Sequence, residues 1–151
     1  MLFSVLPSSI FTLDIYNSLR NHISEISNFK IIGKLGNYVF EDALTDVSII
    51  VGIKNRINFP PKLIWTKNEK GVAQEALREL RKLQANNEIA ISKNSYSIYT
   101  PERFPILENN WRIISLNENK FITDLNVYIG ARKLIKLQEI FTVYQGALLG
   151  T

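Results

Sequence analysis

The sequence has 151 residues, with no cysteine and only one histidine. Without cysteine, the chain has no disulfide framework and no thiolate ligand for a metal. One imidazole, that of His22, is too few for a histidine-based metal cluster, and it allows at most one imidazole base. The predicted helix around His22 presents it on the polar side, so a solvated side chain is expected. We therefore expect no metal site in this chain.

Long apolar runs are also missing, which excludes a membrane-spanning helix. The opening segment Met1–Leu6 is apolar, but it is short, lacks a basic start and is followed by Pro7. It therefore does not resemble a signal peptide. The sequence contains no internal repeat and no low-complexity tract. Together these absences favour a cytoplasmic protein with no membrane partner.

The composition is that of an ordinary globular protein, 46% hydrophobic and 21% charged. The length suffices for one domain with its own core or for parts of two. The net charge of +4 is unevenly distributed, because residues 1–53 carry 3 − 5 = −2 and the rest carries 15 − 9 = +6. A basic second part suits a surface that faces phosphates, although a surplus of this size is common.

The stretch Ile31–Lys54 organises the rest of the chain. Two apolar runs, Phe29–Leu35 and Val47–Lys54, are rich in Ile and Val, as buried strands are. The polar corner between them contains a large ring, Phe40, although hairpin corners are normally solvated. Most Phe side chains are buried, so composition alone favours a Phe40 that folds back onto the core.

The segment before this stretch predicts a strand and a helix. Leu2–Leu6 is typical of a buried strand, and Pro7-Ser8-Ser9 is typical of a helix start with a serine N-cap. Apolar residues then recur at helical spacing, which predicts a helix over about Ser9–Glu25. Strand, helix and strand in succession form the unit of an α/β sheet. The apolar face of the predicted helix consists of Ile15, Tyr16, Leu19, Ile23 and Ile26.

Pro60-Pro61 marks a break and a candidate domain boundary. Capping boxes at Thr66-x-x-Glu69 and Ser115-x-x-Glu118 predict the starts of two helices, and we expect both Trp65 and Trp111 in the core. The predicted elements are a strand at Leu63–Trp65, a helix to about Ala85, a hairpin over Glu88–Tyr99, a helix from Ser115 to about Val127, a helical turn at Lys133–Phe141 and a strand at Phe141–Gln145.

Three motifs follow one another along the chain. The first is VLPSSIF at Val5–Phe11, followed by Asn-Ser-Leu-Arg at 17–20. The second is Lys34–Lys54, in which Leu-Gly, Val-Phe, Ala and an apolar strand succeed one another. The third is KLIKLQEIFTVYQGALLGT at Lys133–Thr151. In this order and spacing they resemble the gamma-class adenine DNA methyltransferases of restriction–modification systems, whereas the part between about Phe59 and Arg132 matches only loosely.

The resemblance implies an α/β fold, with a partial Rossmann-like methyltransferase sheet (strand–helix–strand–hairpin) followed by a mixed α+β segment. The closing hairpin of such a sheet sets one strand antiparallel. Residues 1–58 would be the C-terminal part of the catalytic sheet, and 59–132 a connecting α+β segment. Residues 133–151 would begin the target recognition domain.

The resemblance also implies functional residues. In this family an aromatic residue at the Val-Phe position stacks on the adenine that is flipped out of the duplex, so the role falls to Phe40. Pro7 and Ser8 lie where a strand ends and would form the rim of the base pocket, with a plain helix cap as the alternative. Gln145 and Gly146 would contact DNA, because glycine permits close approach, with a mere turn as the alternative.

Two motifs of the family are missing, namely the Gly-containing cofactor loop and the catalytic Asn/Asp-Pro-Pro-aromatic motif. The only Pro-Pro, Pro60-Pro61, stands in the wrong context. The resemblance therefore implies a fragment of an S-adenosylmethionine-dependent DNA adenine methyltransferase. The fragment would have no catalytic residue and no cofactor of its own and would be inactive alone, while the parent protein would bind S-adenosylmethionine.

The expected partners are double-stranded DNA and the rest of the methyltransferase chain. In the family, an earlier strand flanks the one that matches Leu2–Leu6, so we also expect self-association through an exposed strand edge. Two alternatives remain open. One is a non-catalytic DNA-binding or assembly module with a decayed methyltransferase fold, and the other is an unrelated α/β domain.

Overall fold

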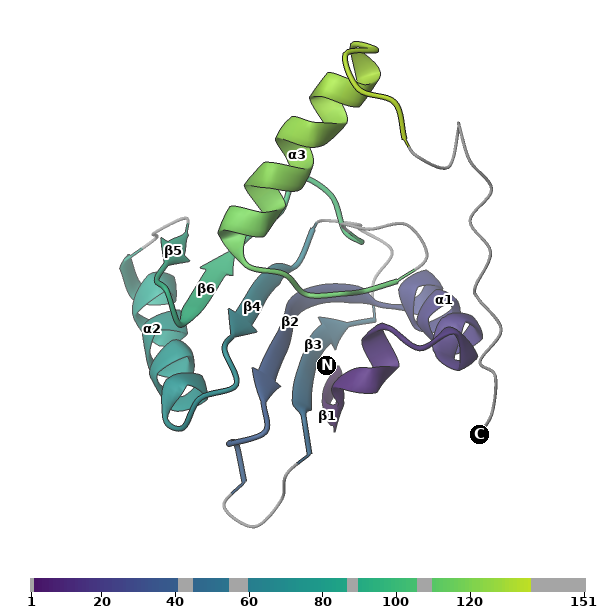
Figure 1. The fold of residues 1–151 in the computed structure, drawn as a ribbon. Coiled ribbons are helices and arrows are strands. Elements are labelled where there is room, and N and C mark those ends of the chain that lie inside the picture. The colour runs from purple at the N-terminus through teal and green to yellow at the C-terminus, as the bar shows by residue number, and fades with distance from the viewer. Residues whose placement is uncertain (1, 41–44, 55–59, 87–89, 106–109, 137–151) are drawn as a thin grey trace, which may run out of the picture. The chain divides into compact units, whose positions relative to one another are not determined.

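Figure 1 shows the computed structural model, which describes residues 2–40, 45–54, 60–86, 90–105 and 110–136. The chain divides after Asn119 into two compact units. The first contains a six-stranded sheet with the strand order β1-β3-β2-β4-β6-β5. The strands are β1 (Leu2–Pro7), β2 (Asn28–Gly36), β3 (Val47–Ile53), β4 (Lys62–Thr66), β5 (Ile91–Ser92) and β6 (Tyr96–Tyr99).

The predicted hairpin of β2 and β3 dominates one half of the sheet. β3 lies between β1 and β2 and is antiparallel to both, so β1 and β2 run in the same direction. β4 pairs with β2 in parallel, and β6 and β5 complete the sheet with antiparallel pairs. The expected α/β class, with a closing strand set antiparallel, is confirmed. The division predicted at residue 58 falls between two strands of this sheet and stays a prediction about the parent protein.

Helix α2 (Val72–Asn86) covers one face of the sheet (Figure 1). Its buried side packs on strand residues that alternate to that face, among them Ile49, Ile64 and Ile98. Gly33 pairs with both Ile49 and Ile64. A Cβ added at Gly33 would lie 3.0 Å from Ile49 Cγ1 and 3.2 Å from Ile64 Cβ. Glycine therefore lets the two isoleucines close beneath the helix.

The opposite face carries an apolar row across four strands. Ile32 pairs with Ile50 on one side and with Leu63 on the other, and Leu63 pairs with Tyr99. Side chains at paired positions point to the same face of a sheet, so these four are neighbours. Each is almost fully buried, so this face needs a cover of its own.

The cover is an extended segment, residues 110–115, which we name the strap. Near the β1 side, the backbone N–H of Trp111 donates to Phe11 O over 2.8 Å. Directly after the strap, the backbone N–H of Leu116 donates to the hydroxyl of Ser97 in β6 over 3.0 Å. The strap therefore crosses the sheet from one side to the other (Figure 1).

The helix predicted over Ser9–Glu25 is broken. Two 3-10 turns, Ser8–Phe11 and Asp14–Tyr16, precede helix α1 (Asn17–Ile26). No side-chain hydrogen bond caps either the first turn or α1, so the predicted serine N-cap is wrong. The predicted apolar face is largely exposed, with exposed fractions of 82% for Ile15, 42% for Leu19 and 47% for Ile26.

The buried residue of α1 is instead Arg20, which is 2% exposed. Its guanidinium donates to Ile10 O over 2.7 Å and to Leu13 O over 2.9 Å, and it also bonds Asn17 Oδ1. Leu13 O also accepts from the backbone N–H of Tyr16 over 3.1 Å, so the guanidinium is a second donor there. At Ile10 O the guanidinium is the donor that a buried carbonyl needs. Arg20 supplies the donor, which explains why a charged side chain points inward.

The two predicted capping boxes have different outcomes. Thr66 lies in β4, where its hydroxyl donates to Lys34 O over 3.2 Å, so this box is wrong. The second box is confirmed at helix α3 (Leu116–Gly130). The backbone N–H of Ser115 donates to Glu118 Oε2 over 2.8 Å, and the N–H of Glu118 donates to Ser115 Oγ over 3.3 Å.

The hairpin predicted over Glu88–Tyr99 corresponds to β5 and β6. Helix α3 continues into the second unit, whose described part ends with a turn at 131–136. Most of the helical turn and strand predicted at Lys133–Gln145 lies outside the described residues. Among the helices of the described ranges, none has the length and apolar character that crossing a membrane requires.

The free edge of β1 leads to a first prediction. Within the described residues β1 pairs with β3 alone, and Phe3 and Val5 are 62% and 45% exposed. Bare strand edges recruit other strands, so the chain should self-associate in sedimentation velocity. Phe3→Lys should shift it toward monomer, whereas Phe121→Lys, at a ring that is 66% exposed on α3, should not. A wild-type chain that stays monomeric at high concentration contradicts this expectation.

Tyr99 leads to a second prediction. Burial, and to a lesser degree the Glu118 carboxylate, raises the pKa of the Tyr99 hydroxyl above its ordinary 10.0, and this hydroxyl donates to Ile114 O over 3.0 Å. The unfolded chain then loses the Tyr99 proton at lower pH than the folded chain. The free energy of unfolding should therefore be insensitive to this group below pH 10 and fall above it.

Denaturant melts between pH 7 and 11 measure this dependence. Tyr99→Phe should flatten the decline above pH 10 and should cost about 1 kcal/mol at neutral pH, because Ile114 O loses its donor. Some decline should remain, since burial also raises the pKa of Tyr96. Equal slopes for the wild type and Tyr99→Phe would show that Tyr99 does not control the alkaline loss.

Candidate functional site

The carboxyl ends of the parallel strands β1, β2 and β4 meet at one edge of the sheet. β2 ends at Gly36, whose φ of +79° is one that side chains rarely tolerate. The next residue, Asn37, donates its backbone N–H to Asn68 Oδ1 over 2.7 Å. A Cβ at Gly36 would lie 3.0 Å from that same oxygen. The glycine therefore allows Asn68 to anchor the start of the corner.

Beyond this anchor the corner alternates between core and solvent. Val39 packs against the core cluster beneath α2, whereas Tyr38 and Phe40 are 45% and 53% exposed. Half of the Phe40 ring is therefore available to another molecule. Its role in stacking on a base stays a prediction.

Ser8 ties the end of β1 to the start of β3. Its backbone N–H donates to Asp46 O over 2.8 Å, and its hydroxyl lies 2.6 Å from the hydroxyl of Ser48. Ser8 is buried and lines a cavity, whereas Pro7 is exposed, pairs with Val47 and does not line that cavity. Their role at the rim of a base pocket stays a prediction.

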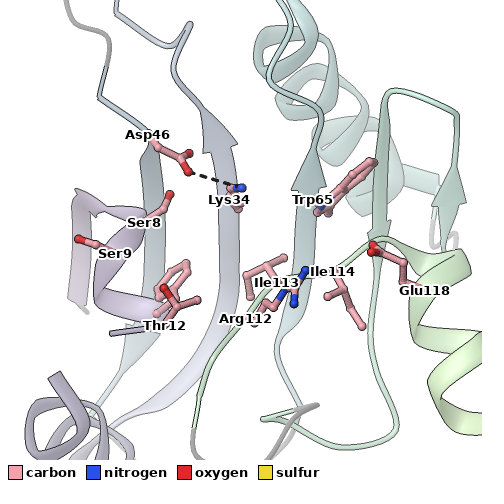
Figure 2. Close-up of a pocket in the computed structure, with 11 residues that line it drawn as sticks. Ser8, Ser9, Thr12, Lys34, Asp46, Trp65, Arg112, Ile113, Ile114 and Glu118 are labelled. Atoms are coloured by element: carbon pink, nitrogen blue, oxygen red, sulfur yellow. Dashed lines mark ion pairs between the residues drawn. The ribbon is translucent and has the colours of Figure 1, made fainter. Parts of the chain in front are cut away.

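The cavity has a volume of about 410 Å³ and opens at the carboxyl ends of the parallel strands (Figure 2). Its walls come from the turn after β1, from the face of the sheet opposite α2, from the strap and from the first turn of α3. The residues that line it are Ser8, Ser9, Phe11, Thr12, Lys34, Asp46, Trp65, Arg112, Ile113, Ile114 and Glu118.

The charges around the cavity are mostly paired. Lys34 Nζ lies 3.5 Å from Asp46 Oδ2 (Figure 2), and Glu118 accepts hydrogen bonds from Ser115. The exposed guanidinium of Arg112 has no acidic partner within the described part of the chain. Asp46 Oδ1 is buried and has no hydrogen-bond donor among the described residues. Among the described residues that line it, the site therefore offers the Arg112 guanidinium as an unpaired cation and Asp46 Oδ1 as an unused acceptor.

Sequence reasoning placed both tryptophans in the core, and the structure separates them. Trp111 is 4% exposed and lies among three phenylalanine rings. Trp65 is half-buried and lines the cavity. It pairs in register with Lys34, and a parallel pairing between distant segments leaves no local signal in the sequence. The sequence around Lys34 and Trp65 therefore did not indicate that the two residues line one site.

The remaining predicted site residues, Gln145 and Gly146, lie outside the described residues. In the described ranges, no group of three or more His, Asp or Glu side chains is arranged to hold a metal ion.

Comparison with known protein families finds no matching family profile. The chain is 28% identical to heat shock 70 kDa protein 13 of Pongo abelii over 160 residues, which cover 95% of this chain and 34% of that protein. The chain thus spans about a third of the length of this curated relative. Among solved structures, it is similar to a chain from a study of complex assembly and conformational transition of the type I restriction–modification system. That similarity has a TM-score of 0.38 and 14% identity, and covers 93% of this chain and 36% of the other.

Proposed function

We propose that the chain is part of an S-adenosylmethionine-dependent DNA adenine methyltransferase and supplies the aromatic face on which the flipped adenine stacks. The single observation that carries the proposal is the place of Phe40. The ring sits at the motif that resembles the family's base-stacking position, four residues after the end of β2, and is 53% exposed. An enzyme that acts on the amine of adenine must take the base out of the duplex, and the flipped base needs a π-face.

The topology supports the same proposal. The family's sheet closes with an antiparallel strand, and here β3 lies between β1 and β2 and runs antiparallel to both. Ligands of open α/β sheets bind beyond the carboxyl ends of the strands. Phe40 and the cavity at Ser8 both lie at that edge. The proposal rests on these features and on the sequence motifs, and on neither of the two similar proteins.

In the proposed reaction, S-adenosylmethionine supplies the methyl group to the exocyclic amine of adenine. The 151 residues contain neither the family's cofactor loop nor its Pro-Pro-aromatic motif, so other residues of the parent would hold the methyl donor. This chain would stack the base on Phe40, and its basic residues beyond Lys54 would face DNA phosphates. Alone, it would not transfer a methyl group.

Two observations favour a second candidate, a non-catalytic assembly module with a decayed methyltransferase fold. β1 has a free edge among the described strands, and the apolar face of α1 is exposed, including Leu19 and Ile26. Surfaces of this kind suit a protein partner. Such a module needs no aromatic face for a base, so variants at Phe40 separate the two candidates.

A third prediction tests the proposed function through Phe40→Ala. Binding is measured by fluorescence anisotropy at low salt, with a duplex that contains one unpaired adenine, because phosphate contacts should dominate and weaken with added salt. Stacking is worth about 1–3 kcal/mol per base, so the variant should bind about 5- to 150-fold more weakly. Its free energy of unfolding should change by less than about 0.5 kcal/mol, because the ring is exposed.

Two phenylalanine variants serve as controls. Phe3→Ala removes a ring that is 62% exposed on β1, away from the corner, and should leave DNA binding unchanged. Phe11→Ala removes a ring that is 2% exposed, and it should cost about 3–5 kcal/mol of stability. If Phe40→Ala destabilises the chain as Phe11→Ala does, Phe40 is a core residue and the stacking role is wrong.

A further inference from the structure

The cavity occupies a position where the sheet changes character. Two residues beyond the apolar row of Ile32, the next row on the same face contains Lys34, which pairs with Ser48 and with Trp65. Trp65 in turn pairs with Ser97. The sheet face therefore turns polar toward the carboxyl ends of the parallel strands, with one indole among the polar side chains.

We propose that this cavity binds a nucleotide, with the base against Trp65 and the phosphate on Arg112. The proposal deepens the proposed function and rests on it only for the source of the nucleotide, a DNA strand. A volume of about 410 Å³ falls within the range of about 300–1,000 Å³ that small-molecule sites occupy.

Trp65 can act as a stacking platform. Among the described residues, aromatic contacts of Trp111 involve Phe11, Phe29 and Phe104, whereas Trp65 has no aromatic neighbour. Its indole is half-buried and lines the cavity. A base that enters can therefore use an aromatic face that the protein itself leaves open, as in single-strand binding sites.

The charged side chains that line the cavity suit a ligand with a single phosphate group. Two cations, Lys34 and Arg112, face two carboxylates, Asp46 and Glu118, so the lining as a whole is neutral. Lys34 is paired with Asp46, which leaves the Arg112 guanidinium for an anion. A planar guanidinium bonds two phosphate oxygens at once. The unused Asp46 Oδ1 can accept a hydrogen bond from an amine or hydroxyl of the ligand.

Titration with deoxyadenosine 5′-monophosphate tests the proposal, because the chain contains only two tryptophans and Trp111 is buried. Stacking should quench the fluorescence of Trp65. By calorimetry, Trp65→Ala should bind about 5- to 150-fold more weakly, and Trp65→Phe, which keeps a ring, should bind within a few-fold of wild type. Arg112→Gln should bind about 10- to 150-fold more weakly, and its affinity for deoxyadenosine, which lacks the phosphate, should equal that of wild type.

Arg81→Gln, at an exposed arginine on α2 away from the cavity, is the matched control and should bind as wild type. The proposal is overturned if Trp65 fluorescence does not respond at millimolar nucleotide, or if both cavity variants bind as wild type. It is also overturned if inorganic phosphate binds as tightly as the nucleotide, because the site would then recognise an anion alone.

A single-stranded deoxyadenosine hexanucleotide identifies the source of the nucleotide. Tighter binding of the hexanucleotide than of the monophosphate supports a DNA strand, and the reverse keeps the nucleotide site but overturns DNA as its source. Phe40→Ala should leave binding of the monophosphate unchanged. If the cavity variants lose the nucleotide while Phe40→Ala binds the unpaired-adenine duplex as the wild type does, the base-stacking function is wrong and the nucleotide site is supported.

Discussion

Replacement of Trp111 by alanine is expected to lower the free energy of unfolding by about 3–5 kcal/mol, the range for a large buried aromatic residue. The indole is 4% exposed. Its ring centroid lies 5.0 Å from that of Phe29, 5.7 Å from that of Phe104 and 6.3 Å from that of Phe11. Truncation removes all three contacts and leaves a cavity between the strap and the sheet. Urea denaturation followed by far-UV circular dichroism measures the loss.

Trp65→Ala is the matched control, since it removes the same side chain from the open cavity. A half-buried indole has less contact area to lose, so its cost should be clearly smaller than that of Trp111→Ala. Equal costs would mean that Trp65 is a core residue, and the stacking surface proposed for the cavity would be wrong.

The strap that Trp111 anchors also forms part of the cavity wall, through Arg112, Ile113 and Ile114. Stability and recognition are therefore coupled on this face of the sheet. A partly destabilised strap would carry the Arg112 guanidinium away from the row of Lys34 and Trp65. Variants that test the cavity should accordingly leave Trp111 unchanged.

The central hairpin could be predicted from the sequence, because its apolar runs are long and separated by a polar corner. The expected runs Phe29–Leu35 and Val47–Lys54 agree with β2 and β3 to within one residue at each end. The N-terminal helix could not be predicted in the same way. Periodic apolar residues such as Ile15 and Leu19 predict a buried face, but that face is exposed and an arginine is buried instead. Periodicity cannot show that a backbone carbonyl in the turn after β1, Ile10 O, accepts a hydrogen bond from a buried arginine.

The candidate site could be predicted only in part. Ser8 directly follows β1 and Phe40 lies four residues after the end of β2, so the sequence motifs place both at the edge where the parallel strands end. Trp65 lines the cavity because β4 pairs with β2. Arg112 lines it because the strap crosses strands that are distant from it in sequence. Long-range pairing of this kind is specified by packing over the whole domain, and no local pattern reports it.

Arg20→Met is expected to lower the free energy of unfolding by about 3–5 kcal/mol, because hydrogen bonds to a charged donor are worth about 1.5–3 kcal/mol each. The variant keeps the length and apolar stem of the side chain and removes its donors. It would remove the guanidinium bonds to Ile10 O at 2.7 Å and to Leu13 O at 2.9 Å, and of the two carbonyls Leu13 O would keep the backbone N–H of Tyr16 as a donor. Thermal and urea denaturation give the cost directly.

Arg112, which lines the cavity, provides the matched control for Arg20. It is exposed and lies in the cavity, so Arg112→Met should change stability by less than about 0.5 kcal/mol. The two variants therefore separate an arginine that holds the fold from one that is free for a ligand. Near-equal stability of Arg20→Met and wild type would show that water satisfies Ile10 O as well as the guanidinium does. The turn after β1, which carries Ser8 into the cavity, would then need another explanation for its position.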